Sequence, residues 1–477
     1  MTALNDSTLS RLAARVSVPA YDRARVRPAV VHIGVGAFHR AHQADYLDRA
    51  LRQGHLEWGI RGVGLLPGDA AVRDALAPQD HLYTLVDLDP TGVARARVVG
   101  SIVDYRYGPD APEALCEVLA GPETRIVSLT ITEGGYSPRS GAGTPRGANV
   151  FAYIVDALRC RRDRGLAPFT VMSCDNVEHN GDVARRAVLD HAATVEPALA
   201  DWIAGHGAFP NSMVDRITPS TTPEVIAAVR DDYGIDDAWP VRSESFTQWV
   251  IEDRFTSGRP PLEDVGVNIV GDVAPYEMMK LRLLNASHQI MSHLGLLAGH
   301  RYVHEVMADD VLGPYVMSYM RNEAVSTLQP VPGIDLDAYI DQLGRRFSSS
   351  AISDTLERQV VDASVRIPKF VLPVIRDRLA AGAPVGHAAL TLAAWCAACE
   401  SNDHAMPDRL GATLRRLSWA DHDAPGAFLE NREVFGDLAT TTVRLRVAYQ
   451  QAKRDLQDLG PRGAARALLA GTAVGRV

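Results

Sequence analysis

The first 275 residues contain short apolar runs that alternate with helical patterns. Four runs rich in β-branched residues lie at 29–33, 59–65, 125–131 and 169–173. Runs without strict polar alternation are typical of parallel strands that are covered on both faces. Helical patterns at 41–53 and 148–162 lie between them. This order predicts a doubly wound α/β domain. Further strand-like pieces follow at 213–218, 243–252 and 267–273.

The second part of the chain has a different pattern. From residue 276 onward apolar residues recur at helical spacing, for instance at 277–295, 387–400 and 431–456. Strand signals are absent there. We therefore expect residues 1–275 to form the α/β domain and residues 276–477 to form a mostly α-helical domain. A cleft between two such domains is the default place for a ligand.

Composition excludes several classes of function. The chain has 58 acidic and 49 basic residues, a net charge of −9, which disfavours a nucleic-acid partner. It has no run of about 20 apolar residues that would span a membrane, and its N-terminus lacks the pattern of a signal peptide. Five cysteines in 477 residues are not a disulfide framework. We expect a cytoplasmic monomer that acts on a small molecule, without a nucleic-acid or membrane partner.

A glycine-containing turn follows the first predicted strand. It and the helix start after it contain five candidate cofactor-binding residues, Gly34, Gly36, Ala37, Phe38 and Arg40. Glycines at this place let the backbone approach a pyrophosphate, and the next helix offers its N-terminal amides. The third glycine of the usual G-x-G-x-x-G pattern is replaced by His39, so an ordinary tight turn is the alternative. We expect His39 and His42 on the surface of this helix.

Two acidic residues follow later predicted strands. Asp69 comes after the second strand, where a carboxylate would bind the ribose hydroxyls of NAD and repel the 2′-phosphate of NADP. Its separation from Gly36 exceeds the usual spacing of about 20 residues, so a turn or capping role is the alternative. Glu133 lies at the end of the third strand, and we expect it to face the cofactor.

Four polar side chains in the segment 276–288 would share one side of an α-helix. With Lys280 at the origin and about 100° per residue, Glu277 lies at about 60°, His288 at about 80° and Asn285 at about 140°. Alcohol oxidation needs a base for the hydroxyl proton, donors for the developing alkoxide and a nicotinamide for the hydride. Lysine can be that base only if burial or a nearby cation lowers its pKa. A solvated charged face is the alternative.

Five segments together resemble the polyol-specific long-chain dehydrogenases. They are GVGAFHR at 34–40, TEGGY at 132–136, SCDNVEHNG at 173–181, FPNSMVDRITP at 209–219 and the helix with Lys280, Asn285 and His288. The resemblance implies an NAD-dependent, metal-independent interconversion of a polyol and a ketose, such as D-mannitol and D-fructose. Arabinitol, sorbitol and polyol-phosphate dehydrogenases and fructuronate or tagaturonate reductases are the alternatives within the family. The TEGGY segment looks more like the mannitol branch than the uronate branch.

The resemblance also implies roles for single residues in the reaction. Lys280 would be the general base, and Glu277 would govern proton exchange between this lysine and solvent. Asn176 and Asn285 would form an oxyanion hole. His288 would bind substrate hydroxyls.

Three further residues are implied in substrate binding. Asp215 corresponds to a substrate-binding aspartate and Arg358 to a substrate-binding arginine. Many relatives read D-G-S-S-K where this chain reads DASVR at 362–366, so Arg366 replaces an active-site lysine. Arginine is longer, planar and always charged. Arg366 either shapes a different polyol pocket or lies outside the pocket.

Two other classes of function compete with a polyol dehydrogenase. Cys396 and Cys399 have the C-x-x-C spacing of a zinc site, but they lie in an apolar helical segment without a second pair. We therefore expect packing thiols and no metal, and the same holds for Cys174. A non-catalytic nucleotide-binding protein would keep the glycine turn and would not need the lysine, asparagine and histidine of the 276–288 segment.

Overall fold

The computed structural model describes residues 1–136, 149–401, 407–438 and 442–474. The chain forms two compact units, Met1–Ala274 and Pro275–Val477. Residues 137–147 contain two prolines and three glycines, which predicts a loop, and they lie outside the described residues. The α/β prediction for the first part of the chain and the helical prediction for the second part are both confirmed.

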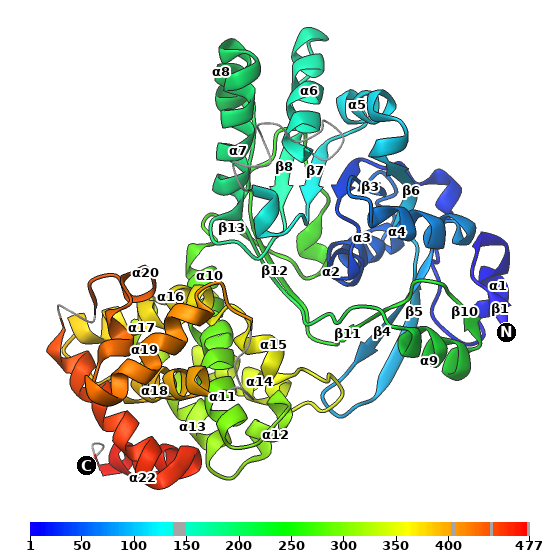
Figure 1. Cartoon of the computed structure of the whole chain (residues 1–477). Helices are drawn as coiled ribbons and strands as arrows, with labels where there is room; N and C mark the ends of the chain where they lie inside the picture. Colours follow the sequence, from blue (N-terminus) through cyan, green and yellow to red (C-terminus); the bar gives the residue numbers. More distant parts are fainter. Residues whose placement is uncertain (137–148, 402–406, 439–441, 475–477) are drawn as a thin grey trace. The chain divides into compact units, whose positions relative to one another are not determined.

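A five-stranded parallel sheet forms the centre of the first unit (Figure 1). Its strands, in spatial order, are β6 (Ile102–Tyr107), β3 (Ile60–Gly64), β2 (Val30–Ile33), β7 (Ile126–Leu129) and β8 (Thr170–Ser173). The chain leaves β2 toward β3 on one side and later returns to β7 on the other side. The carboxyl end of β2 is therefore a topological switch point, where open α/β sheets bind their ligands.

The side chains of this sheet alternate between two hydrophobic cores. Val30 and Ile60 belong to a core with α3 (Gln43–Arg52). Val31 and Val127 belong to a second core that also contains residues of α5 (Pro112–Ala120), α6 (Val150–Asp163) and α7 (Asn180–Val195). Burial on both faces explains why these strands read as continuous apolar runs.

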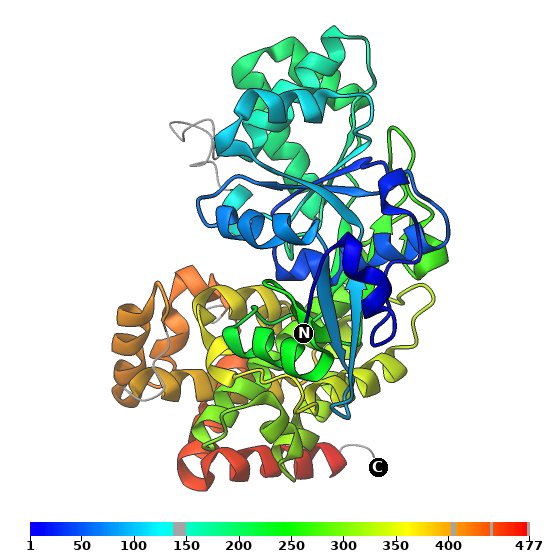
Figure 2. The same cartoon turned by 90° about the vertical axis from the view of Figure 1, so that its right-hand side faces the viewer.

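Three smaller sheets complete the first unit. Their strand orders are β11–β4–β5, β13–β12–β9 and β1–β10. The strands are β1 (Thr2–Ala3), β4 (Tyr83–Leu88), β5 (Ala94–Val99), β9 (Ser212–Asp215), β10 (Ile235–Asp236), β11 (Val241–Glu244), β12 (Gln248–Glu252) and β13 (Asn268–Val270). The piece predicted at 243–252 is thus two strands in two sheets. The β4–β5 hairpin extends as a long ribbon from the rest of the unit (Figures 1 and 2). The remaining helices are α1 (Leu9–Leu12), α2 (Ala37–Ala41), α4 (Asp69–Leu76), α8 (Pro197–His206) and α9 (Pro223–Tyr233).

The second unit is helical. Its helices are α10 (Ala274–Met279), α11 (Ala286–Leu297), α12 (Val303–Ala308), α13 (Leu312–Tyr319), α14 (Leu336–Phe347), α15 (Leu356–Val360), α16 (Ala363–Phe370), α17 (Leu372–Ala380), α18 (Gly386–Glu400), α19 (Gly411–Asp423), α20 (Arg432–Phe435) and α22 (Val443–Val474). Two stretches are π-helical, Lys280–Asn285 and Met320–Ala324. Among its described residues the β pairing is limited to an isolated bridge between Tyr302 and Thr355.

The helix predicted at 431–456 is interrupted. The short helix α20 ends at Phe435, because Gly436 adopts φ 61°, a left-handed value that suits glycine and ends a helix. The following helix, α22, packs along α18 and is drawn in red in Figure 2. A kink at Gly460 and Pro461 divides α22.

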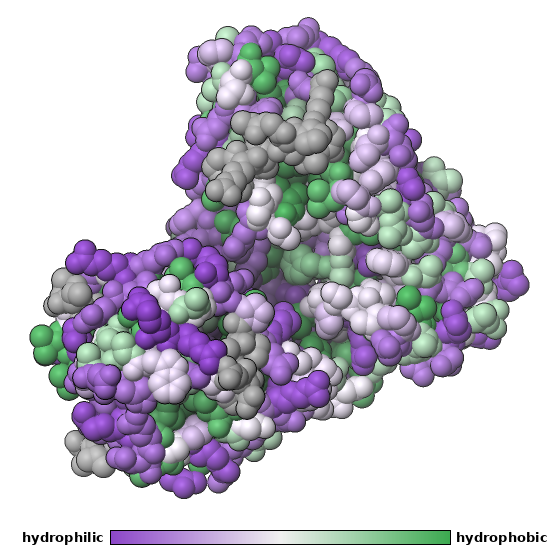
Figure 3. Space-filling model, in the orientation of Figure 1, coloured by the Kyte–Doolittle hydropathy of each residue, from purple (hydrophilic) through white to green (hydrophobic). Residues whose placement is uncertain are grey.

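No described helix combines the length and the apolar character that crossing a membrane requires. On the face that Figure 3 shows, hydrophilic residues cover most of the surface and apolar residues form small patches.

Candidate active site

The turn at the carboxyl end of β2 contains two glycines with different roles. Gly34 allows a backbone conformation with positive φ, and Gly36 leaves the backbone open to a ligand. Gly34 has φ +96°, and a Cβ atom on it would lie 2.2 Å from the carbonyl oxygen of Thr130. Gly36 is the exposed N-cap of α2, and a Cβ atom on it would meet nothing closer than 4.0 Å. The open backbone at Gly36, followed by Ala37 and Phe38, is the surface that a pyrophosphate requires.

The histidines after this turn are buried, and the expected surface positions are wrong. The helix breaks at His42, so α2 has a single turn before α3 begins. His39 stacks on His32 of β2, with 3.4 Å between the ring centroids. Nε2 of His42 lies 2.9 Å from the carbonyl oxygen of Gln248 in β12. Both side chains face the interior because neighbouring strands supply their partners.

Arg40 is also placed differently from the expectation that it meets the cofactor. Its side chain is 1% exposed, and its guanidinium donates to the carbonyl oxygen of Trp239. The same guanidinium lies over the ring of Tyr83. Burial lowers the pKa of Arg40 to about 10. The side chain of Arg40 therefore packs in the interior of the first unit, which argues against its direct contact with the cofactor.

Asp69 performs the capping role that the sequence left open. One oxygen of its carboxylate accepts hydrogen bonds from the backbone N–H groups of Leu65 (2.8 Å) and Leu66 (2.9 Å). These bonds fix the loop between β3 and α4, at the same edge of the sheet as the glycine turn. A contact of Asp69 with ribose stays a prediction.

The loops after β7 and β8 are tied together by a residue that the sequence did not single out. Asp175 accepts hydrogen bonds from the backbone N–H groups of Ile131 (3.1 Å) and Thr132 (2.7 Å) and from the hydroxyl of Tyr136 (2.7 Å). Burial raises the pKa of Asp175. The two loops present the exposed side chains of Glu133 and Asn176. An acidic residue two positions after a predicted strand was the available signal for Asp175.

A second set of contacts joins the motif at 173–181 to the motif at 209–219. The amide of Asn180 donates to the carbonyl oxygens of Asp175 (3.0 Å) and Ser212 (2.8 Å), and its oxygen accepts from the N–H of Ser212 (2.9 Å). Gly181 is needed because a Cβ atom would lie 2.4 Å from the carbonyl oxygen of Pro210. Strand β9 is thereby fixed beside the β8 loop, and it ends at the buried Asp215.

The helix with Lys280 is not a regular α-helix. Between α10 and α11 the segment Lys280–Asn285 is π-helical, and the N–H of Ala286 donates to the carbonyl oxygen of Leu281, five residues earlier. Residues five apart are then one turn apart, so Asn285 lies on the side of Lys280 and the α-helical wheel misplaces it. π-Helical turns often occur at functional sites.

The predicted polar set on this helix is largely buried. Lys280 is 7% exposed, and Glu277 and His288 are buried to a similar extent. The Oδ1 atom of Asn285 is buried without a hydrogen-bond partner among the described residues. A solvated charged face is therefore excluded for this helix. Buried polar groups without an obvious structural need are typical of functional sites.

An arginine holds the π-helical turn in place. Arg282 is buried, donates to the carbonyl oxygen of Thr327 (2.7 Å) and forms an ion pair with Asp377 (2.6 Å). These contacts bind the turn to the segment after α13 and to α17. The turn is thus supported from outside the helix.

The other predicted substrate residues of this unit surround a buried carboxylate. Asp354 is 7% exposed, and its Oδ2 atom lies 4.0 Å from Nε2 of His288. Its Oδ1 atom accepts hydrogen bonds from Nη2 (2.7 Å) and Nε (3.1 Å) of Arg358. Nη1 of Arg366 lies 3.2 Å from the carbonyl oxygen of Gln359, the next residue after Arg358. Asp354 and Gln359 were missed in the sequence because no motif marks them.

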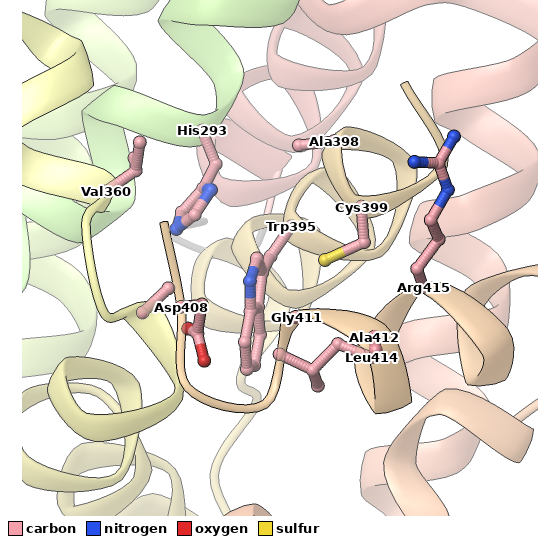
Figure 4. A pocket seen from close by; sticks show the side chains of 11 residues that line it. His293, Val360, Trp395, Ala398, Cys399, Asp408, Gly411, Ala412, Leu414 and Arg415 are labelled. Carbon is pink, nitrogen blue, oxygen red and sulfur yellow. The ribbon is translucent and has the colours of Figure 1, made fainter. Parts of the chain in front are cut away.

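A separate cavity in the second unit has a volume of about 320 Å³ and includes none of the predicted site residues among its described lining. Figure 4 shows the His293 and Trp395 rings and the Asp408 carboxylate on one side of it and Arg415 on the other. Cys399 also lines this cavity, and burial raises the pKa of its thiol.

The remaining cysteines that the sequence singled out are buried. Cys396 and Cys174 lie in the interior, and burial raises the pKa of Cys396 to about 12. Among the described residues no group of three or more histidine, cysteine or acidic side chains is arranged to hold a metal ion.

Comparison with known proteins places these features in a family. Residues 28–264 match the family model of the mannitol dehydrogenase Rossmann domain, and residues 272–453 match that of the mannitol dehydrogenase C-terminal domain. A mannitol 2-dehydrogenase of Phaeosphaeria nodorum is 42% identical over 96% of this chain and 84% of its own length.

Solved structures agree with this assignment. The ternary complex of Pseudomonas fluorescens mannitol 2-dehydrogenase with NAD and D-mannitol is 43% identical and covers 98% of this chain and 100% of its own, with a TM-score of 0.86. A substrate-free D-sorbitol dehydrogenase is 35% identical and covers 97% of this chain and 100% of its own, with a TM-score of 0.89. The predicted resemblance is confirmed: the chain belongs to the mannitol dehydrogenase family.

Proposed function

We propose that this protein catalyses the NAD-dependent, metal-independent oxidation of a polyol to a ketose, D-mannitol to D-fructose, and the reverse reaction. The observation that carries the proposal is the π-helical turn that sets Asn285 on the side of a buried Lys280, with the buried His288 following on α11. The Pseudomonas fluorescens relative, solved with NAD and D-mannitol, supports both the cofactor and the substrate.

The first unit is suited to be the NAD-binding domain. The open backbone at Gly36 would receive the pyrophosphate, with Gly34, Ala37 and Phe38 forming the turn around it. Asp69 would bind the ribose hydroxyls, and its charge disfavours the 2′-phosphate of NADP. Glu133 would approach the cofactor from the loop after β7. The bound nicotinamide supplies the hydride acceptor of the oxidation.

The second unit supplies the proton chemistry. Lys280 takes the proton of the reacting hydroxyl. Its amine is buried, and burial favours the neutral form of an amine, which is the form that can accept a proton. The amide N–H of Asn285 donates to the same oxygen as negative charge develops on it, which lowers the barrier. Asn176, in the loop after β8 of the first unit, stays the predicted second donor. Glu277, three residues before Lys280, passes the proton between the lysine and solvent.

The polar groups for the rest of the substrate suit a neutral polyol. His288, Asp215, Arg358 and Arg366 would bind its hydroxyls. The charge of Arg358 is already balanced by Asp354 at 2.7 Å, so this arginine is not an uncompensated cation for a uronate or a phosphate. D-Sorbitol is the second candidate substrate, because a D-sorbitol dehydrogenase covers 97% of this chain at 35% identity.

The assay is NADH formation with D-mannitol, D-sorbitol and D-arabinitol, and NADH consumption with D-fructose and the two uronates. We expect the highest kcat/KM for D-mannitol and D-fructose. Lys280→Ala should lower kcat by about a thousandfold and leave the Kd for NADH unchanged. The control is Lys369→Ala on α16, which should keep wild-type kcat. Unchanged turnover in Lys280→Ala would contradict the mechanism, and NADH binding without turnover in the wild type would indicate a non-catalytic protein.

A further inference from the structure

The buried carboxylate of Asp354 lies next to two residues of the proposed substrate site, Arg358 and His288. Oδ1 of Asp354 binds the guanidinium of Arg358 at 2.7 and 3.1 Å, and Oδ2 lies 4.0 Å from Nε2 of His288. The three residues come from different parts of the second unit: His288 from α11, Arg358 from α15 and Asp354 from the loop before α15. One side chain therefore links the helix of Lys280 to the segment with Arg358.

Gln359 fixes this carboxylate from the other side. Its Nε2 atom donates to both oxygens of Asp354, at 3.1 and 2.9 Å. Its carbonyl oxygen accepts from Nε2 of Gln289 (2.7 Å) and from Nη1 of Arg366 (3.2 Å). Gln289 and Gln359 are both buried. The network thus spans α11, α15 and α16.

Asp354 is fixed in place, and it therefore determines the position of the Arg358 guanidinium. A buried carboxylate is costly unless it is paired and hydrogen-bonded, and Asp354 is both. The side chain of Arg358, in contrast, is 63% exposed and would otherwise sample many rotamers. A fixed carboxylate at 2.7 Å sets the position of the guanidinium and also cancels its charge.

We propose that Asp354, held by Gln359, is a positioning and specificity-determining residue: it orients Arg358 and His288 for a neutral polyol and disfavours anionic sugars. The inference rests on the proposed function, because it requires that Arg358 and His288 bind the substrate. Its selectivity follows from charge. With Asp354 ionised the pair is neutral, whereas without that charge the Arg358 guanidinium is an uncompensated cation that attracts a uronate or a phosphate.

The test is Asp354→Asn, which keeps the shape of the side chain and removes its charge. We expect the KM for D-mannitol to rise about tenfold or more, with a smaller change in kcat and an unchanged Kd for NADH. The ratio of kcat/KM for D-fructuronate over D-fructose should rise about tenfold. A purely structural role would not move this ratio. If Asp354→Asn does not fold, Gln359→Met provides the test, because it keeps the charge of Asp354 and removes the amide that holds the carboxylate. The KM for D-mannitol should then rise while the ratio stays near its wild-type value, and an unchanged KM would overturn the positioning role.

A double-mutant cycle tests whether Asp354 acts through Arg358. In an Arg358→Met background, Asp354→Asn should change the ratio of kcat/KM for D-fructuronate over D-fructose by less than about threefold. The reason is that the guanidinium whose charge Asp354 balances is absent from this background. The matched control is Asp421→Asn, which also removes a buried carboxylate from an ion pair, here with Lys453 at 2.6 Å on α22. It should lower the Tm and leave the KM and the ratio unchanged.

The outcomes separate this inference from the proposed function. An unchanged ratio in Asp354→Asn, or additive effects in the cycle, would overturn the role of Asp354 even if Lys280→Ala is inactive. Wild-type turnover in Lys280→Ala would instead overturn the proposed function.

Discussion

The imidazole rings of His32 and His39 stack face to face, with centroids 3.4 Å apart and planes 9° from parallel. His32 belongs to β2, and its ring nitrogens lie 2.8 Å from the hydroxyl of Ser128 and 2.9 Å from that of Thr130. Burial lowers the pKa of His32 to about 3 and that of His39 well below 6.5. The pKa of the neighbouring His42 is lowered by burial to about 3 as well. The glycine turn is thus built on three neutral histidines.

We predict that the protein loses stability in mild acid. The unfolded chain binds protons to these histidines below pH 6.5, whereas the folded chain resists protonation until about pH 3. The stabilisation is therefore complete above pH 6.5 and is lost as the pH falls from 6.5 toward 3. For His32 and for His42 the free energy of unfolding should fall by about 2 kcal/mol each between pH 7 and pH 5. Urea unfolding at pH 7, 6 and 5 measures the loss. His39→Phe, which keeps a flat ring on His32, should lose less over this range, and an equal loss would contradict the origin of the effect.

We predict that Gly34→Ala lowers stability, whereas Gly36→Ala weakens the binding of NAD. At Gly34 a Cβ atom would lie 2.2 Å from the Thr130 carbonyl oxygen at φ +96°, so the substitution should lower the free energy of unfolding by about 2 kcal/mol or more. At Gly36 the space is open, and Gly36→Ala should keep the wild-type Tm and raise the KM for NAD about tenfold, because the methyl group takes the place of the pyrophosphate. Gly205→Ala in α8, where the space is also open, is the control. Wild-type NAD affinity in Gly36→Ala would show that the pyrophosphate binds elsewhere.

Most of the architecture was predictable because it depends on local patterns. Continuous apolar runs such as 126–129 signal strands that are buried on both faces, and the long helical spacing after residue 276 signals helices. The strands β1, β4, β5, β6 and β10 were not predicted. Arginines and exposed positions interrupt the apolar pattern of β5, and its pairing with β4 is what makes it a strand. Gly436 shows the same limit, because a single backbone angle divides a helix that spacing alone would continue.

Site residues could be predicted where a sequence motif marked them. They could not be predicted where their role depends on contacts between residues that are far apart in the sequence. Lys280 and Asn285 stood out by type and spacing, but the π-helical turn between them changes their relative angle without a trace in the periodicity. Arg40 was assigned to the cofactor from its place in the glycine motif, yet the carbonyl group that it binds is on Trp239, far along the chain. Asp354 carries no signal at all, since its partners are assembled only in the folded unit.

We predict that shortening the π-helical turn keeps Asn285 beside Lys280. Deletion of Leu281 removes one residue from the turn, so that hydrogen bonds of the α-helical type can continue from α10 into α11. The Tm should stay the same or rise, because the less favourable turn is removed. The kcat should stay within about threefold of the wild-type value, because Asn285 is then four residues after Lys280 and lies on the same side of an α-helix. Calorimetry and NADH formation measure the two effects, and a loss of kcat would show that the turn does more than place Asn285 on the side of Lys280.

We predict that stability and activity respond differently to a substitution of Asn285. Its Oδ1 atom is buried without a hydrogen-bond partner among the described residues, an arrangement that costs stability. Asn285→Ala removes this atom and also introduces a better helix former, so the Tm should not fall. The kcat should drop about a hundredfold to a thousandfold through the loss of a donor to the developing oxyanion. Asn322→Ala is the matched control, because Asn322 lies in the second π-helical segment and its amide donates to the hydroxyl of Ser318 at 2.8 Å. That variant should lower the Tm and keep kcat, and the reverse pattern in the two variants would mean that Asn285 is a structural residue.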